Sequence, residues 1–469
     1  MVMVPRRIVD RLRRVGLALT SMLFLTSQTA LHTQKASISE ATIRAHMEFL
    51  ASDAMKGRGS GTEDEWRAAE YIGSQLRRLG VEPLGDNGGF VQRIATGRSR
   101  VTTPPVLSFG DREFTHGREI LAQTLGAGSA TGPLAKYGTD AQMSSAAFLL
   151  LPEGVTPDQS MSTATAILMP QTPQIRASWL ARAATPLVTP TPSGGRPPPA
   201  RLFLNPDAYA TVAALANGTT LSFTAALQPQ YTWNALGQLR GSNADTATDV
   251  ILLSAHLDHL GVRGTGPDTI FNGADDDASG TTAVLVLAEA LAAGKRPKRT
   301  VMFVWFGSEE AGGIGARHFL EAPPVALDRI VANIEFEMIG RPDSIVAPHT
   351  LWITGYERSN LGPELAKHGA RVVADPHPEQ RFFTRSDNIQ LACEGVVAQT
   401  ISSFGLHKEY HTAADDLAHI DFAHMTEAIA SMLAPVLWIS NATFKPAWRS
   451  GQKPVAGNPC PTKRVEVGG

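Results

Sequence analysis

The sequence predicts an α/β fold: a mixed, mostly parallel sheet flanked by helices on both faces, with a β-rich domain inserted into it. From about residue 234 onward, short apolar runs alternate with helical patterns, which is the order typical of a sheet covered by helices on both sides. Residues 105–233 differ in composition, because they are rich in Thr, Pro, Ala and Ser. The chain of 469 residues has room for two to four domains of roughly 100–200 residues each.

Charge and composition exclude several classes of protein. The 42 Lys and Arg residues nearly balance the 44 Asp and Glu residues, which argues against a nucleic-acid-binding surface and against an acidic tail. A hydrophobic content of 43% argues against bulk disorder. Cys393 and Cys460 are too few for a disulfide scaffold or a cysteine zinc site, and they either form one bridge or remain free. A metal site in this chain would therefore use His and carboxylate ligands.

The N-terminus has the pattern of a secretory signal. Five arginines at positions 6–14 precede the apolar run 15–25. The run is 11 residues long, too short for a membrane span of about 20 residues. We expect residues 1–33 to be a signal peptide, the protein to be secreted or periplasmic, and no other part of it to contact a membrane. The alternative is a basic amphipathic helix on the folded protein.

The remaining elements follow in chain order. Residues 39–80 carry apolar positions at helical spacing, interrupted by a glycine-rich loop at 56–62 that lacks the features of a phosphate loop. We expect one discontinuous domain (34–104 and 234–445), an inserted domain (105–233) and a C-terminal tail (446–469). Apolar runs predict strands at 250–255, 301–306, 331–339 and 395–401, and helices at 280–293 and 422–439, the last kinked at Pro435.

Polar side chains follow these predicted strands. His256 closes the first strand with Asp258 two residues later, Asp276 lies between two other aspartates before a helix, and Glu309-Glu310 follows the second strand. The carboxyl ends of strands are where sites form in open α/β sheets. Taken singly, each motif has an ordinary alternative: a structural His-x-Asp, a solvated helix N-terminus, or an exposed acidic loop.

Two further motifs add to this set. Glu335 and Glu337 lie in an apolar run, where buried acids need a partner or a metal, and period-two alternation places them on one side of the strand. His411 is a second candidate imidazole ligand. The alternatives are an edge strand with solvated acids and an ordinary surface histidine.

Together the motifs favour a zinc site with nitrogen and oxygen ligands. The charges of Asp276, Glu310 and Glu337, with one hydroxide, balance two zinc ions, and paired metals are a known device for activating water. Glu309 points in a different direction from its neighbour Glu310. It is therefore free to act as a general acid/base.

The motifs also resemble a known family, the co-catalytic dizinc aminopeptidases typified by secreted bacterial leucyl aminopeptidase and aminopeptidase Y. The resemblance covers most of the chain outside the insert. The insert is similar to a protease-associated domain in its position in the chain, and less so in its sequence. Its motifs, in order, are residues 49–53, 57–59, 69–72, 254–259, 273–280, 308–310, 333–338 and 409–412.

The resemblance implies a metal-dependent exopeptidase that removes N-terminal residues from peptides with a dizinc-activated water. It implies that His256 binds one zinc with Asp258 behind it, and that Asp276 bridges both ions. Glu337 would complete the shell of the first zinc. Glu310 and His411 would hold the second zinc, and Glu309 would be the general acid/base.

The chain departs from the family pattern at two positions. Glu337 stands where Asp is usual, and Asn388 stands where His is common. The longer Glu337 side chain puts the metal spacing in question, and Asn388 puts the substrate-side role of its loop in question. We expect Glu335 to help hold the free amine of the substrate.

Other activities remain open from the sequence. A dizinc carboxypeptidase of the glutamate-carboxypeptidase type needs a basic residue for the substrate carboxylate, and Arg341, Arg381 and Arg385 are candidates. A non-catalytic receptor-like ectodomain of the same fold typically loses ligands, and none is lost here. The complete ligand set also disfavours a single-zinc glutaminyl cyclase. Side-chain specificity and oligomeric state stay open.

Overall fold

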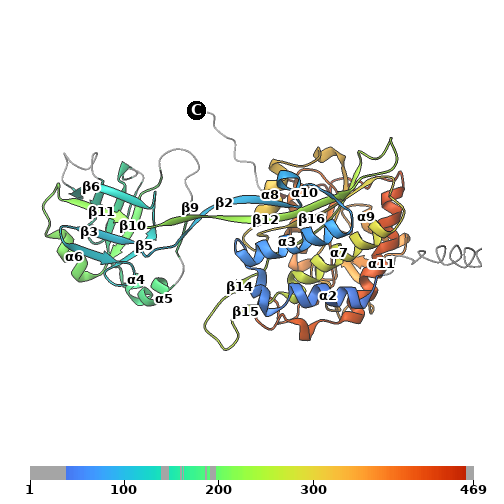
Figure 1. The fold of residues 1–469 in the computed structure, drawn as a ribbon, viewed down its shortest axis with the longest axis horizontal. Helices are drawn as coiled ribbons and strands as arrows, with labels where there is room; N and C mark the ends of the chain where they lie inside the picture. The colour runs from blue at the N-terminus through green and yellow to red at the C-terminus, as the bar shows by residue number, and fades with distance from the viewer. Residues whose placement is uncertain are drawn as a thin grey trace, which may run out of the picture.

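The computed structural model describes residues 38–460, apart from 139–146, 159–160, 162, 185–186 and 191–196. Two bodies lie side by side along the long axis of the molecule and are joined by a two-stranded ribbon (Figure 1). The larger body contains the strands and helices expected from residue 234 onward. The expected signal peptide lies outside the described residues.

The larger body is built on a sheet with the strand order β19-β18-β20-β17-β13-β16-β12-β2-β9. Every residue of its four central strands is buried, as their continuous apolar sequence requires when both faces are covered. These strands run parallel to one another and are β13 (Val250–His256), β16 (Thr300–Phe306), β17 (Ile330–Phe336) and β20 (Ala398–Ser402).

Antiparallel strands extend this centre on both sides. β12 runs antiparallel to β16 and to β2, and β18 runs antiparallel to β20. The sheet is mixed, as predicted, but the prediction that it is mostly parallel was too strong, because it holds only for the centre. The added strands are β1 (Glu82–Pro83), β2 (Val91–Val101), β9 (Val188–Pro190), β12 (Leu227–Leu239), β18 (Leu351–Ile353) and β19 (Val372–Ala374).

Helices cover both faces of this sheet. α2 (Glu40–Leu50), α3 (Glu63–Arg78), α7 (Gly280–Ala293), α9 (Leu361–Lys367) and α11 (Phe422–Asn441) contribute to the apolar cluster on one face. α8 (Ile314–Glu321) and α10 (Asn388–Cys393) contribute to the cluster on the other face.

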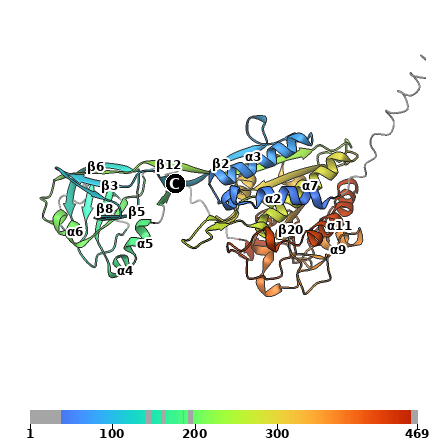
Figure 2. The same cartoon turned by 60° about the horizontal axis from the view of Figure 1, so that its bottom comes forward.

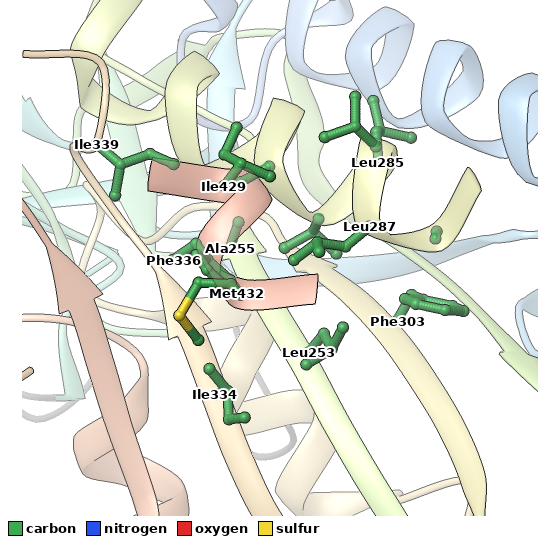
Figure 3. Packing of buried hydrophobic residues seen from close by; sticks show 14 of the residues in the cluster. Leu253, Ala255, Leu285, Leu287, Phe303, Ile334, Phe336, Ile339, Ile429 and Met432 are labelled. Atoms are coloured by element: carbon green, nitrogen blue, oxygen red, sulfur yellow. The ribbon is translucent and has the colours of Figure 1, made fainter. Parts of the chain in front are cut away.

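Side chains of the central strands alternate between the two clusters. Leu253 belongs to the first cluster and its neighbour Leu252 to the second, in keeping with the period of two along a strand. Figure 3 shows Leu253 and Ile334 of the sheet near Leu287 of α7 and Met432 of α11. The core thus fixes the sheet between two helical layers and leaves the carboxyl ends of the strands for polar residues.

The smaller body has a sheet of its own, with the order β4-β3-β11-β6-β7-β8-β10-β5 and a separate apolar cluster. β2 and β12 pair along the ribbon that reaches it from the larger body (Figure 2). Its strands are β3 (Val106–Phe109), β4 (Arg112–Thr115), β5 (Ile120–Thr124), β6 (Ser129–Lys136), β7 (Phe148–Leu150), β8 (Ala166–Pro170), β10 (Ala200–Leu204) and β11 (Thr220–Thr224), and its helices are α4 (Pro173–Ala177), α5 (Trp179–Ala184) and α6 (Pro206–Ala213).

The C-terminal segment returns to the larger body. Cys460 forms a disulfide with Cys393 at the end of α10, which decides between the two possibilities that the sequence left open. α11 continues through Pro435. Among the described residues, α11 alone is long and apolar enough to cross a membrane, but 50% of its most apolar window is buried, as in a core helix. The remaining short strands are β14 (Gly261–Val262), β15 (Ile270–Phe271), β21 (Val455–Ala456) and β22 (Pro459–Cys460).

Candidate metal centre

The polar residues singled out from the sequence meet at one edge of the central sheet. His256 is the last residue of β13, Glu309-Glu310 lies just beyond β16, and Glu337 follows the end of β17. Parallel strands bring their carboxyl ends to the same edge, so these side chains converge. Loops before α7 and α11 add Asp276 and His411.

Their donor atoms form two overlapping groups, each compact enough for one metal ion. The first consists of His256, Asp276 and Glu337. The second consists of His259, Asp276, Glu310 and His411. Within each group the donor atoms lie within 4.8 Å of one another. The structure thus brings together all five ligands expected from the sequence and adds His259.

Asp276 is shared because its two carboxylate oxygens face opposite ways. Oδ1 lies 3.2 Å from Nε2 of His256, and Oδ2 lies 3.1 Å from Nε2 of His411. Glu337 stands at the edge of the first group, with Oε1 3.9 Å from Nε2 of His256. This is the arrangement of a carboxylate that joins two adjacent cation sites.

The residues fit metal ions by their chemistry as well as by position. Buried polar atoms normally have a hydrogen-bond partner, and these ligand atoms lack one within the described part of the chain. The donor set of imidazole nitrogens and carboxylate oxygens, without sulfur, suits zinc. The unpartnered atoms are Nε2 of His256, Nδ1 of His259, Oε1 of Glu310 and Nε2 of His411.

Charge at the centre is concentrated and poorly hydrated. Burial raises the pKa of Glu337 to about 7, and the nearby Asp276 and Glu310 carboxylates add to the rise. Burial lowers the pKa of His411, but the carboxylates of Asp276 and Glu310 outweigh it and raise the pKa to about 9. Since carboxylates crowd together here out of water, a bound cation would stabilise their ionised form.

Glu309 is separate from both groups. Its side chain is mostly buried, and burial, with help from Asp387, Glu337 and Glu310, raises its pKa well above the ordinary value of a glutamic acid. Glu309 and Glu310 therefore differ as the sequence suggested: one lies among the ligands and the other beside them. A carboxyl group with a raised pKa next to a cation site is suited to proton transfer.

Asp258 lies behind His256, on the Nδ1 side of its ring. The ring nitrogen Nδ1 of His256 lies 3.2 Å from the backbone oxygen of Asp258 and 3.8 Å from its carboxylate. The carboxylate instead accepts the backbone N–H groups of Glu309 at 2.9 Å and Glu310 at 3.3 Å. Asp258 thus holds both the strand that carries His256 and the turn that carries the two glutamates.

Glu65 was not among the site residues that the sequence motifs predicted. It is fully buried, and its Oε1 accepts the backbone N–H of Ser308 at 2.8 Å and the Thr232 hydroxyl at 2.7 Å. Ser308 has a positive φ of 54°, a conformation that few non-glycine residues adopt. Glu65 therefore fixes the turn before Glu309, and its place in the amphipathic helix α3 gave no signal of this.

The expected role of Glu335 is wrong. Glu335 is fully buried, and its Oε2 accepts the backbone N–H of Asn388 at 2.6 Å and the Thr400 hydroxyl at 3.1 Å. It therefore holds the start of α10 and does not face a substrate. The Asn388 side chain also points inward, where it donates to the Phe383 carbonyl at 3.2 Å.

A cavity whose lining includes four aromatic side chains, the aromatic cavity, opens beside Glu337. Arg385 lines it, whereas Arg341 pairs with Glu409 at 3.1 Å and Arg381 lines another cavity. Of the three arginines that could hold a substrate carboxylate, Arg385 is the one that lines the same cavity as Glu337. The cavity is lined by Glu337, Met338, Trp352, Thr354, Phe382, Arg385, Thr400, Ser402, Phe404 and Tyr410.

Parts of the chain are similar to known aminopeptidases. An aminopeptidase of Pseudomonas aeruginosa (strain UCBPP-PA14) is 34% identical over 113 residues, which are 24% of this chain and 19% of that protein. A probable lipoprotein aminopeptidase, LpqL of Mycobacterium tuberculosis, is 33% identical over 127 residues, 27% of this chain and 23% of that protein. The chain thus spans less than a quarter of the length of either relative.

The chain is also similar to a solved structure and to a protein-family model. The aminopeptidase from Aneurinibacillus sp. strain AM-1 has 18% sequence identity and a TM-score of 0.47, over 89% of this chain and 95% of that chain. The model of Peptidase family M28 matches residues 234–436, which include every side chain of the two metal-binding groups. This match confirms the resemblance that the sequence suggested: residues 234–436 are similar to Peptidase family M28.

Proposed function

We propose that the protein is a zinc-dependent aminopeptidase that removes single residues from the free N-termini of peptides. The observation that carries this proposal is the pair of ligand groups that share Asp276, with Glu309 beside them and in neither group. The family match of residues 234–436 and the names of the relatives support it.

Two zinc ions are the proposed cofactors. His256, Asp276 and Glu337 would hold one ion, and Asp276, Glu310 and His411 would contribute to holding the other. When bound, zinc supplies a Lewis acid and a water whose pKa is lowered towards neutrality.

Glu309 is the residue that transfers the proton, as general base and then as general acid. A carboxylate beside the ligands takes a proton from the attacking water and gives it to the leaving amine, so one group carries out both proton transfers. Asp258 and Glu65 hold the turn on which Glu309 stands, because each accepts backbone N–H groups of that turn. They act as positioning residues, without touching the substrate.

The aromatic cavity beside Glu337 is the proposed site for the first side chain of the substrate. Along its wall Phe382 stacks on Trp352 and meets Phe404 edge to face, and such surfaces favour apolar side chains. Because the cavity adjoins the proposed first zinc site, the bond after that residue would be the one cut.

We also propose the domain division and the location of the protein. Residues 34–104 with 234–445 form the catalytic domain, residues 105–233 form an inserted domain similar in kind to a protease-associated domain, and residues 446–469 form the tail. The separate sheets and apolar clusters of the two bodies support this division. The arginine-rich start of the chain supports a signal peptide at 1–33 and export.

We expect the purified protein to hold two zinc ions per chain, and a chelator to abolish its peptidase activity until zinc is restored. Asp276→Asn should lower the occupancy of both sites, since its carboxylate is common to them. The exposed Asp245 provides a control, because Asp245→Asn should keep both ions. Elemental analysis with parallel rate measurements checks this, and full activity with no metal or one ion would contradict it.

We expect cleavage to require a free amine on the substrate. A leucyl nitroanilide should be cut, since it has a free amine and no free carboxylate, and its N-acetyl derivative should resist. A peptide blocked at the N-terminus but free at the C-terminus tests the carboxypeptidase alternative. If that peptide is cut and the nitroanilide is not, Arg385 becomes the recognition residue and the aminopeptidase assignment fails.

A further inference from the structure

We propose that His259 is a fourth protein ligand of the second metal ion, alongside Asp276, Glu310 and His411. The two metal sites then differ in kind: one has four protein ligands, and the other has three. The inference rests on the proposed function, since it concerns the ions of the same centre. It assigns a role to a histidine that neither the motif pattern nor the family resemblance had given one.

The position of the His259 ring carries the inference. The side chain is fully buried, and Nδ1 lies 2.9 Å from Oε1 of Glu310 and 3.6 Å from Oδ2 of Asp276. Despite the short distance, Nδ1 and Oε1 are not aligned as a hydrogen bond, and neither ring nitrogen has another partner among the described residues. A buried imidazole without a partner is costly, and a metal ion between these atoms would satisfy it.

His411 approaches the same two oxygens from the other side. Its Nε2 lies 3.1 Å from Oε1 of Glu310 and 3.1 Å from Oδ2 of Asp276. Four ligands about 2.0–2.1 Å from a tetrahedral zinc ion lie about 3.3 Å from one another. The four nitrogen–oxygen separations, 2.9–3.6 Å, bracket that value, and all four donor atoms lie within 4.8 Å of one another, as one tetrahedral site requires.

The chain holds His259 in place with its backbone. Its N–H donates to the Arg58 carbonyl at 3.1 Å, and its carbonyl accepts the N–H of Ser60 at 3.3 Å. Both partners belong to the glycine-rich loop of residues 56–62, to which the sequence motifs assigned no chemical role. The loop therefore serves to fix an imidazole at the metal centre.

Gly273 makes room for the ring. A Cβ atom at Gly273 would lie 2.5 Å from Cγ of His259, and the glycine has a φ of +61°, which side chains rarely adopt. The His259 ring therefore packs directly on the backbone of the loop that carries Asp276. The backbone of His259 is thus held by the loop of residues 56–62 and its ring lies against the backbone at Gly273, so the imidazole is placed before any ion binds.

The difference between the sites has a chemical meaning. Zinc sites with four protein ligands are typically closed and structural, whereas catalytic sites keep a position open beside three protein ligands. We assign tight anchoring to the site of His259, Asp276, Glu310 and His411. The site of His256, Asp276 and Glu337 keeps a position free for water and substrate.

Chelator titration of the full-length protein tests this assignment. Wild-type protein loaded with two zinc ions should release one ion at a low chelator concentration and the second ion only at a much higher concentration. Loss of a partner that merely orients a ligand lowers metal affinity by about 10–100-fold. His259→Ala should therefore lower the zinc affinity of the tighter site by more than about 100-fold. His424→Gln is the matched control, because His424 is also buried but bonds the Ser403 hydroxyl outside the two groups, and it should leave both steps unchanged.

A measurement on the wild type guards against a variant that fails to fold. With one equivalent of zinc, X-ray absorption should count two imidazoles around the ion, since only the four-ligand site contains two histidines. One imidazole, or a His259→Ala protein with the wild-type release curve, would overturn the inference. If the wild type binds no zinc at all, it is the proposed function that fails.

Discussion

Glu309→Gln is expected to lower kcat by about 10²–10⁴-fold while both zinc ions stay bound, the range typical for loss of general acid/base catalysis. Glutamine has the same size as glutamate but cannot take up and return a proton. The backbone of the turn would be unaffected, because Asp258 accepts the N–H of residue 309 whatever its side chain. KM should change little, since Glu309 belongs to neither ligand group and does not line the aromatic cavity.

Glu310→Gln is the matched comparison for this prediction. It makes the same chemical change one residue further on, at a carboxylate whose Oε1 faces His259 and His411. We expect it to lower zinc occupancy, and to lower activity as a consequence. Metal content and single-turnover rates for the two variants decide the roles. A Glu309→Gln protein that loses zinc, beside a Glu310→Gln protein that keeps it, would show that the roles are reversed.

Arg58→Met is expected to be strongly destabilising, with a loss of about 3–5 kcal/mol in the free energy of unfolding, as for one partner removed from a buried charge network. The Arg58 guanidinium is buried and donates to the carbonyls of Leu257 at 2.9 Å, Asn272 at 2.8 Å and Gly273 at 2.9 Å. Methionine would fill the space of the side chain but leave these carbonyls without a donor.

The charge of Arg58 adds to the effect. Burial lowers its pKa from the usual arginine value, while Asp277, Asp415, Asp258 and Asp276 oppose the change, so the cation offsets negative charge around the metal centre. Arg67→Met is the control, because Arg67 is about half exposed and pairs with Glu63 on the helix surface, where a pair contributes at most about 1 kcal/mol. Urea unfolding of both variants measures the difference, and equal losses would refute the role of Arg58.

The fold was predictable where burial determines the sequence. Strands β13 and β16 are covered on both faces, so their apolar runs mark them within a residue or two of the observed ends. That His256 and Glu310 lie at one edge of the sheet was also predictable, because each stands at or just beyond the end of a strand that is visible in the sequence. The directions of the strands were harder to predict, since the antiparallel pairing of β12 and β18 depends on contacts far away in the chain.

The errors arise where the backbone leaves a regular element. Period-two alternation placed Glu335 and Glu337 on one face, but β17 ends at Phe336, and Met338 has a φ of 51°. Glu337 therefore turns to the metal centre while Glu335 stays in the sheet. His259 was missed for a similar reason. It lies beyond β13, and its direction is set by the main chain of residues almost 200 positions earlier, which no local pattern reports.

The shared carboxylate of Asp276 makes the two metal sites thermodynamically dependent on each other. An ion at either site would fix the orientation of Asp276 and change the charge that the other site presents. The coupling is reciprocal, so the factor by which the first ion alters the affinity for the second is the same in either order of binding. The zinc concentration over which the proposed peptidase activity appears would then depend on this coupling as well as on the affinity of each site.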